Sequence, residues 1–91
     1  MTPSDKAAIA GYMGWEIEFD YYVDHRIKKA INFDLNDAGL CVEKMVEKGD
    51  LEDFEYHVIH CHLSATGSMT QWLFNPENFF TAMSAWVRRA A

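Results

Sequence analysis

The chain has 91 residues and a formal net charge of −6, with hydrophobic residues making up 49% of the sequence and aromatic residues 14%. This length predicts a single domain, residues 1–91, whose apolar content is enough for one dense core. The acidic balance argues against a surface of clustered Lys and Arg, so we expect no direct binding of nucleic acid and instead a partner with a basic surface.

The first predicted element is a helix that ends at about Met13. Thr2 or Ser4 can cap its N-terminus, because a side-chain oxygen there can accept from the first free backbone N–H groups. Pro3 suits the first helical position, where no backbone N–H is needed. Gly14 can end the helix in the left-handed conformation, so both ends of this helix carry a signal.

Residues 15–24 alternate apolar and acidic side chains almost without a break. Successive side chains of a strand point to opposite faces, so this alternation predicts a half-buried β-strand. The face predicted to be buried carries Trp15, Ile17, Phe19, Tyr21 and Val23. The face predicted to be exposed carries Glu16, Glu18, Asp20 and Asp24. The sequence therefore predicts a sheet with one dry face and one acidic face.

The next two elements are a strand and a helix. Residues 26–33 alternate apolar and polar side chains again and predict a second strand, antiparallel to the first. Residues 34–48 predict a helix, because apolar residues recur there every three or four positions. Asp34 can cap this helix, and Gly49 can end it.

The last part of the chain predicts a second hairpin and a final helix. Residues 54–63 are rich in β-forming side chains and predict a third strand. The loop 64–68 contains Gly and leads to a fourth predicted strand, residues 69–74. Asn75 and Pro76 predict the start of the last helix. The order α-β-β-α-β-β-α predicts an α+β fold, with one four-stranded antiparallel sheet packed by three helices.

Short motifs at the helix ends span nearly the whole chain. Met13-Gly14-Trp15 leads from the first helix into a strand, the central helix closes on Glu43-Lys44-Met45-Val46-Glu47-Lys48-Gly49, and the last helix opens at Asn75-Pro76 and closes on Trp86. In these motifs the chain resembles the phage ABA sandwich domains, a family of small bacteriophage proteins. The resemblance implies an α/β sandwich and a phage or prophage origin, and it carries no chemistry over to any residue.

The acidic face of the first strand is the candidate binding surface. Its carboxylates are spaced about 6.7 Å apart, twice the rise of a strand residue, and anions with this period can imitate a nucleic-acid backbone. An exposed Tyr among acids is also typical of protein interfaces. The candidate partner-binding residues are Glu16, Glu18, Asp20, Tyr22 and Asp24. The alternative is a solvated strand face whose charge prevents aggregation, and the sequence leaves both interpretations open.

A histidine-rich segment lies in the predicted third strand. His60 and His62 share one strand face there, so they offer two of the ligands that a metal site needs and can respond to a pH of about 6. The alternative is that these side chains form an ordinary polar outer face. Because only two ligands are brought together, we predict no resident metal and no other cofactor.

The two cysteines, Cys41 and Cys61, both lie inside apolar patterns. Their position predicts buried free thiols in a reducing compartment rather than a disulfide. No apolar run reaches the length of a membrane span. We therefore expect a cytoplasmic protein without a membrane partner.

The sequence contains no nucleophile elbow, phosphate loop or zinc-protease helix, so we predict that the protein is not an enzyme. We predict a non-catalytic, acidic protein-binding module. With the phage resemblance, this becomes a phage-encoded protein in the host cytoplasm that inhibits or modulates a host protein, for which a nucleic-acid-binding defence complex of the CRISPR type is a candidate. Two alternatives stay open: a metal- or pH-responsive module, and a homodimeric structural phage protein.

Overall fold

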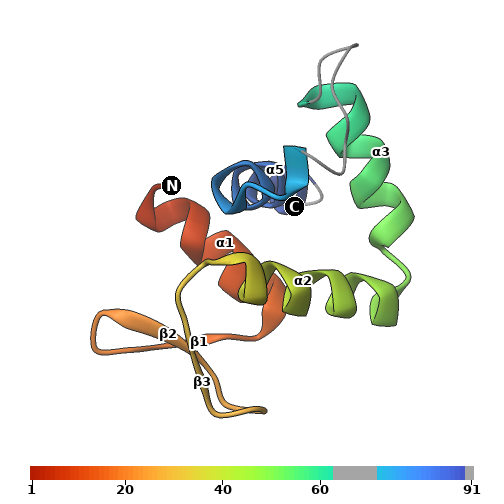
Figure 1. Cartoon of the computed structure of the whole chain (residues 1–91). Coiled ribbons are helices and arrows are strands. Elements are labelled where there is room, and N and C mark those ends of the chain that lie inside the picture. The colour runs from red at the N-terminus through yellow and green to blue at the C-terminus, as the bar shows by residue number, and fades with distance from the viewer. Residues whose placement is uncertain (63–71, 90–91) are drawn as a thin grey trace.

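The computed structural model describes residues 1–62 and 72–89. Within them the chain forms four helices and one three-stranded antiparallel sheet (Figure 1). The elements are α1 (Pro3–Met13), β1 (Glu16–Glu18), β2 (Tyr21–Asp24), β3 (Lys29–Ile31), α2 (Leu35–Lys48), α3 (Leu51–Cys61) and α5 (Pro76–Arg89). The predicted α+β class is confirmed, whereas the predicted four strands and three helices differ from these elements.

Helices α1 and α2 begin and end where the capping signals predicted. Thr2 Oγ1 accepts from the backbone N–H of Asp5, and the Asp5 side chain accepts in turn from the backbone N–H of Thr2. Asp34 makes the same reciprocal pair with a second acid, three residues further on. Both helices end at a glycine in the left-handed conformation, Gly14 with φ 77° and Gly49 with φ 76°.

The prediction of one continuous strand over residues 15–24 is wrong, because this segment folds back on itself as a hairpin. Strands β1 and β2 pair antiparallel, with Glu18 opposite Tyr21 and Glu16 opposite Val23. Residues directly opposite each other share a face of the sheet. The glutamates of β1 therefore lie on the same face as apolar side chains of β2, and the predicted separation of a dry face from an acidic face does not exist.

The predicted second strand is present but shorter, and it is the third strand of the sheet. Strand β3 pairs antiparallel with β2, with Ile31 opposite Tyr22 and Lys29 opposite Asp24. Residues 25–28 form the turn between them. The sheet order is therefore β1-β2-β3.

The predicted third strand, residues 54–63, is wrong, because helix α3 occupies most of this segment. Phe54, His57 and Val58 are buried, and this spacing of three and four places them on one helix face. Packing of that face outweighs the β propensity of the individual residues, which is a weak local preference. The predicted loop 64–68 lies outside the described residues.

The predicted fourth strand, residues 69–74, lies partly outside the described residues. In its described part, Trp72 and Leu73 have helical geometry and lead into a turn, so no strand forms there. The final helix is confirmed, because α5 begins at Pro76 and the Asn75 side chain accepts from the backbone N–H of Glu77 at 2.9 Å.

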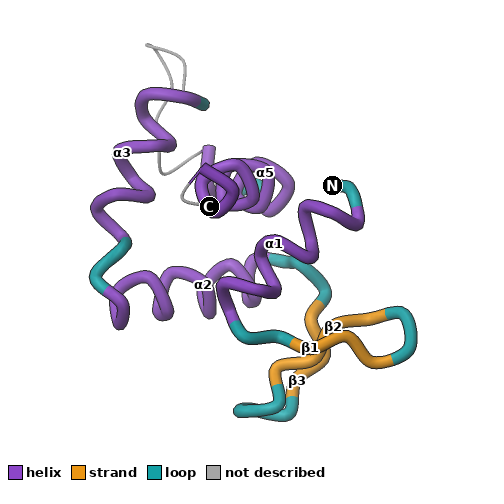
Figure 2. The backbone as a smooth tube through the Cα atoms, turned by 180° about the vertical axis from the view of Figure 1, so that it is seen from behind, coloured by secondary structure: helices purple, strands orange, loops and turns teal. Residues whose placement is uncertain are grey.

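The core lies between the helices rather than between a sheet and helices. Helix α5 contacts α1, α2 and α3, which surround it (Figure 2). The buried apolar side chains are Ile9, Ala10, Met13, Trp15, Ile31, Ala38, Cys41, Met45, Phe54, Val58, Phe79, Phe80, Ala82, Met83 and Trp86. Of these, only Ile31 belongs to a strand, so the small sheet is an extension of a helical domain.

One buried carboxylate fixes the sheet to the helices. Asp37 of α2 is fully buried and accepts from Lys29 Nζ of β3 and, at 2.7 Å, from the backbone N–H of Asn32. A buried charge is tolerated only when it is paired and hydrogen-bonded, and Asp37 meets both conditions. This cluster sets the position of the sheet, and with it the position of the β1–β2 hairpin.

Candidate functional site

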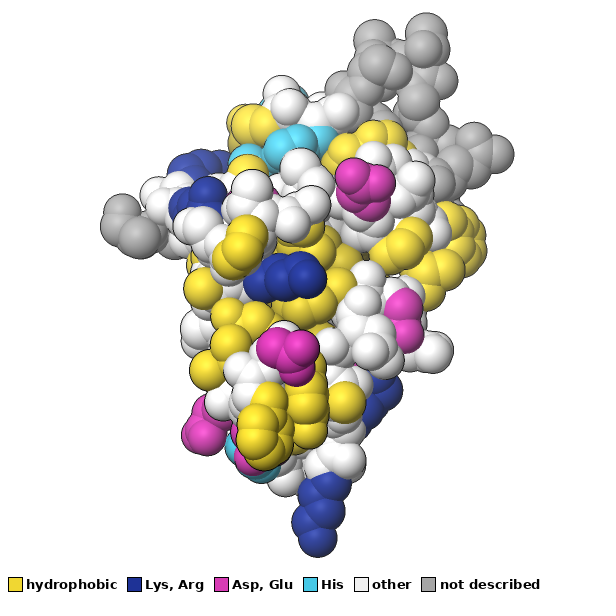
Figure 3. Space-filling model, turned by 90° about the vertical axis from the view of Figure 1, so that its left-hand side faces the viewer, with side chains coloured by type: hydrophobic (Ala, Val, Ile, Leu, Met, Phe, Trp, Pro, Cys, Tyr) yellow, Lys and Arg dark blue, Asp and Glu magenta, His cyan; other side chains and the backbone are white. Residues whose placement is uncertain are grey.

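The β1–β2 hairpin extends away from the four helices, as Figures 1 and 2 show. Its large apolar side chains face solvent, with exposed fractions of 61% for Ile17, 94% for Phe19 and 42% for Tyr21. The ring centroids of Phe19 and Tyr21 are 6.4 Å apart. Hydrophobic side chains gather over this part of the molecule in Figure 3, with acidic side chains beside them. Clustered exposed apolar side chains of this kind mark interaction sites.

The backbone of the turn makes this exposure unusual. Phe19 and Asp20 form the two-residue turn, and of these two only Phe19 has a positive φ, of 57°. In a hairpin turn with a positive φ at its first position, glycine is the usual residue because a side chain is strained there. For a residue with a side chain this conformation costs about 1–2 kcal/mol. A bulky phenylalanine therefore occupies a position that glycine would fill without strain, and the core gains nothing from its ring.

Carboxylates surround the exposed apolar side chains. The Glu16 and Glu18 side chains are 75% and 45% exposed, and their oxygens lie 3.6 Å and 3.4 Å from His25 Nε2. Asp20 is exposed in the turn itself. When His25 is protonated, its charge offsets part of the acidic field of the two glutamates. The hairpin tip thus combines apolar contact area with carboxylate acceptors.

The outer edge of β1 adds backbone groups to the site. Within the described residues, β1 pairs only with β2. The N–H and C=O groups on its other side are free of strand partners in that part of the chain. An exposed edge strand can accept an additional strand from another protein, which gives main-chain hydrogen bonds next to the apolar tip.

The five predicted partner-binding residues do not share one face. Glu16, Glu18 and Asp20 are exposed on the hairpin, as expected. Tyr22 is half-buried and packs edge-on against Phe33, with ring centroids 6.1 Å apart. It therefore holds the hairpin against the core instead of facing a partner.

Asp24 also lies away from the exposed surface, since its exposed fraction is 5%. Its carboxylate accepts from Trp15 Nε1 at 3.2 Å and from the backbone N–H of Arg26 at 3.0 Å. These bonds make Asp24 part of the base of the hairpin. The alternating pattern had placed Ile17, Phe19 and Tyr21 inside, so it missed them as site residues, and the turn Phe19-Asp20 contains no glycine or asparagine that would have revealed the hairpin.

Contrary to the sequence prediction, the structure does not bring His60 and His62 together on one face. Because residues 57–61 are helical, His60 and His62 do not share a strand face. His60 is exposed and stacks on Tyr56, whereas His62 Nε2 lies 2.8 Å from Nε2 of the buried His57. Burial, and next the neighbouring His62, lower the pKa of His57 below its usual value. Among the described residues, no three His, Cys, Asp or Glu side chains come close enough together to hold a metal ion.

The two cysteines are free thiols with different surroundings. Cys41 is fully buried, as predicted, and burial raises its pKa well above the usual value. Cys61 is exposed on α3, so the prediction of a buried thiol there is wrong. Its spacing of three and seven residues from Val58 and Phe54 places Cys61 on their face of α3, so its exposure comes from its place as the last residue of the helix and not from its face.

Comparison of the chain with protein-family models, curated proteins and solved structures found no match. The likeness to the phage ABA sandwich domains therefore stays a prediction from the short motifs. In the part of the chain that the structure describes, none of the helices has the length and apolarity required to cross a bilayer.

Proposed function

We propose that the protein is a non-catalytic binding module that holds a partner protein with its β1–β2 hairpin. The observation that carries this proposal is Phe19, which is 94% exposed and stands in a backbone conformation that disfavours large side chains. Strain that no local packing explains points to a functional demand at that position. An exposed aromatic residue that enters a pocket of a partner is the usual centre of a protein interface.

The chemistry of the hairpin defines the partner surface. The apolar tip of Phe19 and Tyr21 fits an apolar hollow, and Glu16 and Glu18, which lie on the same sheet face as Tyr21, fit Lys or Arg around it. Such carboxylates increase the association rate and the specificity more than they increase the affinity. The partner is therefore a protein with an apolar hollow inside a basic surface.

The resemblance to phage proteins adds a biological setting to this proposal. In that setting the protein is encoded by a phage, acts in the host cytoplasm and inhibits or modulates a host protein. A nucleic-acid-binding defence complex of the CRISPR type has the basic surface that the hairpin requires. The strand spacing of about 6.7 Å that would imitate a nucleic acid holds only for Glu16 and Glu18 of β1, because Asp20 lies in the turn and Asp24 is buried.

Affinity capture from a host lysate tests the proposal when wild type and variants are compared side by side. We expect wild type to retain a host protein that Phe19→Gly loses, since the exposed ring is removed. The double variant Glu16→Lys/Glu18→Lys should retain the same protein more weakly. Tyr56→Ser is the matched control, because it removes an aromatic side chain that is 59% exposed on α3, away from the hairpin.

The proposal fails if Phe19→Gly retains the same protein as strongly as Tyr56→Ser does. It also fails if every protein retained by wild type is lost equally in Tyr56→Ser. Far-ultraviolet circular dichroism of each variant, measured beforehand, separates loss of binding from loss of folding.

A further inference from the structure

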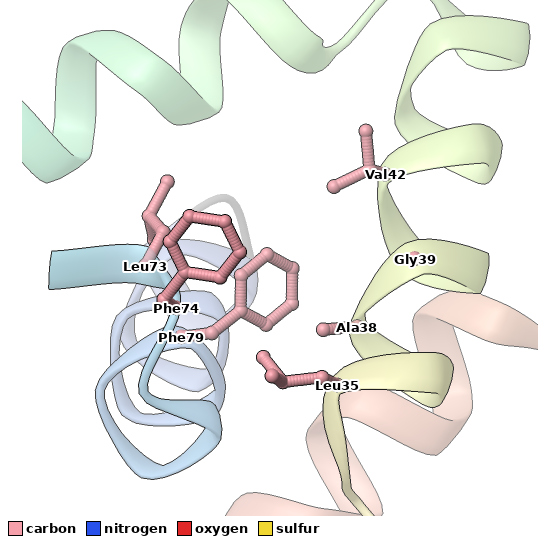
Figure 4. A pocket seen from close by; sticks show the side chains of 7 residues that line it. All are labelled: Leu35, Ala38, Gly39, Val42, Leu73, Phe74 and Phe79. Atoms are coloured by element: carbon pink, nitrogen blue, oxygen red, sulfur yellow. The ribbon is translucent and has the colours of Figure 1, made fainter. Parts of the chain in front are cut away.

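A second apolar surface lies between α2 and the start of α5. Its groove has a volume of about 330 Å³, and its lining consists of Leu35, Ala38, Gly39, Val42, Leu73, Phe74 and Phe79. Figure 4 shows the rings of Phe74 and Phe79 on one side of this groove, facing Leu35 and Ala38 on the other. The groove shares no residue with the β1–β2 hairpin, so it is a separate surface.

The α2 wall of the groove has the pattern of a helix that packs against another helix. Leu35, Gly39, Val42 and Val46 are spaced four, three and four residues apart and form one stripe along α2. The two ends of this stripe face solvent, with Leu35 46% and Val46 61% exposed, whereas Val42 is partly buried against the core. A Cβ atom built on Gly39 would meet nothing within 4 Å, so the backbone of a second helix can come close there.

The groove continues toward α3 as a second hollow of about 340 Å³, lined by Val46, Gly49, Leu51, Glu52 and Glu55. Val46 follows Val42 by about one helical turn, so the two hollows adjoin along the same stripe. From Leu35 to Val46 the stripe is about 16 Å long at 1.5 Å per residue, which is the length of three turns of a docked helix.

The charges beside the stripe indicate which charge a helix bound in the groove should carry. Glu52 and Glu55 line the second hollow, and Glu43 and Glu47 are exposed on the flank of α2 next to the stripe. Lys48 lies on the opposite flank, where its Nζ is 4.1 Å from the Tyr12 ring and donates to the Tyr12 backbone oxygen. An apolar groove bordered by glutamates is complementary to an amphipathic helix with Lys and Arg on its polar side.

We propose that the stripe and the two hollows bind a basic amphipathic helix of a partner protein. A second copy of this chain is a poorer occupant, because its net charge of −6 and its own glutamates would meet the same acidic border. This site stands apart from the hairpin, so either surface can be tested without the other.

A synthetic peptide is a suitable probe. We choose an acetylated and amidated 14-residue peptide with Leu at positions 1, 5, 8 and 12 and only Lys and Ala elsewhere, labelled for fluorescence anisotropy. The full chain should bind it saturably, with a Kd on the order of 10 μM, and more weakly as salt increases. A peptide with Glu in place of every Lys should bind at least about tenfold more weakly, a difference of about 1.4 kcal/mol.

Two variants connect the binding to the groove. Gly39→Leu fills it from a position with open space, and Val46→Lys places a positive charge on an exposed part of the stripe. Each should weaken binding at least about tenfold. Tyr56→Lys makes the same charge change as Val46→Lys outside both hollows and should leave the Kd unchanged, as should Phe19→Gly.

Three results would each overturn the proposal. They are the absence of saturable binding to wild type, equal affinity of wild type and both groove variants, and equal affinity for the Lys and Glu peptides. Sedimentation equilibrium of the chain alone could give a further contrary result. A dimer that Gly39→Leu abolishes would mean that a second copy of the chain, and not a partner helix, occupies the groove.

Discussion

In the proposed function, Phe19 favours binding at the expense of stability. Its positive φ costs about 1–2 kcal/mol, while Phe19 is 94% exposed and its ring centroid lies 6.4 Å from that of Tyr21. Glycine removes the strain but also loses more backbone entropy on folding, by about 0.5–1 kcal/mol. The difference between these two costs is small and favours glycine.

We therefore predict that Phe19→Gly leaves the free energy of unfolding unchanged or raises it by up to about 1 kcal/mol. Urea unfolding measures this directly. Phe19→Ala is the matched control, because it removes the ring but keeps the strained Cβ, and it should not gain stability. A loss of more than about 1 kcal/mol in Phe19→Gly would mean that the ring stabilises the fold, and the functional explanation of its exposure would be wrong.

His57 gives the domain a titratable group inside its helical core. Its side chain is 5% exposed and its Nε2 lies 2.8 Å from His62 Nε2. Asp53 and Arg89, whose side chains lie 2.9 Å apart, also act on it, the acid raising its pKa and the base lowering it. The net direction is downward because burial and His62 dominate. The folded state therefore holds a proton on His57 less readily than the unfolded state does.

The sign of the pH effect follows from this difference. Below about pH 6.5 the unfolded chain binds the proton at His57 more tightly than the folded chain, so we predict that the free energy of unfolding falls as the pH is lowered from 7 to 5. Urea unfolding at both values checks this. His57→Gln should reduce the fall, whereas His60→Gln, at an exposed position of the same helix, should retain it. If the free energy of unfolding falls equally in wild type and in His57→Gln, then His57 is not the group that causes the pH dependence.

The capping signals predicted helices better than the alternation of side chains predicted strands. Capping residues act on the backbone groups of the nearest helix turn, so the ends of α1 and α2 and the beginning of α5 followed from the sequence. These residues are Thr2, Gly14, Asp34, Gly49 and Asn75. The hairpin did not follow from the sequence, because a two-residue turn keeps the alternation intact while reversing which side chains share a face. Helix α3 could not be predicted from the sequence either. Its residues favour a strand locally, but the burial of Phe54 and Val58 in the core stabilises the helix more than this preference stabilises a strand.

The candidate site was predictable only in its charges. Glu16 and Glu18 were expected to be exposed on a strand, and they are. The apolar tip could not be predicted, because a strand pattern assigns Ile17 and Phe19 to the core unless the turn between the strands is recognised. The groove beside α2 was equally hidden, because the three- and four-residue spacing of apolar residues in α2 predicts a buried face, whereas Leu35 is 46% exposed.

The buried carboxylate of Asp37 links β3 to α2. Asp37→Ala leaves Lys29 and the backbone N–H of Asn32 without their buried acceptor. We predict a loss of about 3 kcal/mol or more in the free energy of unfolding by urea. Glu47→Ala, at an exposed position of the same helix, should change it by no more than about 0.5 kcal/mol. A loss of less than about 1 kcal/mol in Asp37→Ala would show that the cluster does not hold the sheet in place.

In the molecule as a whole, the helices form the core and the exposed hairpin lies outside it. The four helices bury nearly all of the core, and Asp5 of α1 joins α5 through Ser84 Oγ at 2.8 Å and Arg88 at 3.1 Å. The sheet adds little to this core, yet Asp37 holds it in a defined place. Because the hairpin lies outside this core, it can carry exposed aromatic and acidic side chains without disturbing the packing between the helices.

Photo-crosslinking from the hairpin tip can show whether it contacts a partner protein. We would place p-benzoylphenylalanine at position 19 of the full chain, irradiate it in a host lysate and repeat this with the same group at position 56. We expect position 19 to form a protein adduct that position 56 does not form. Excess wild type should suppress this adduct, whereas excess Phe19→Gly should not. No such adduct from position 19, or the same adduct from both positions, would contradict the proposed role of the hairpin.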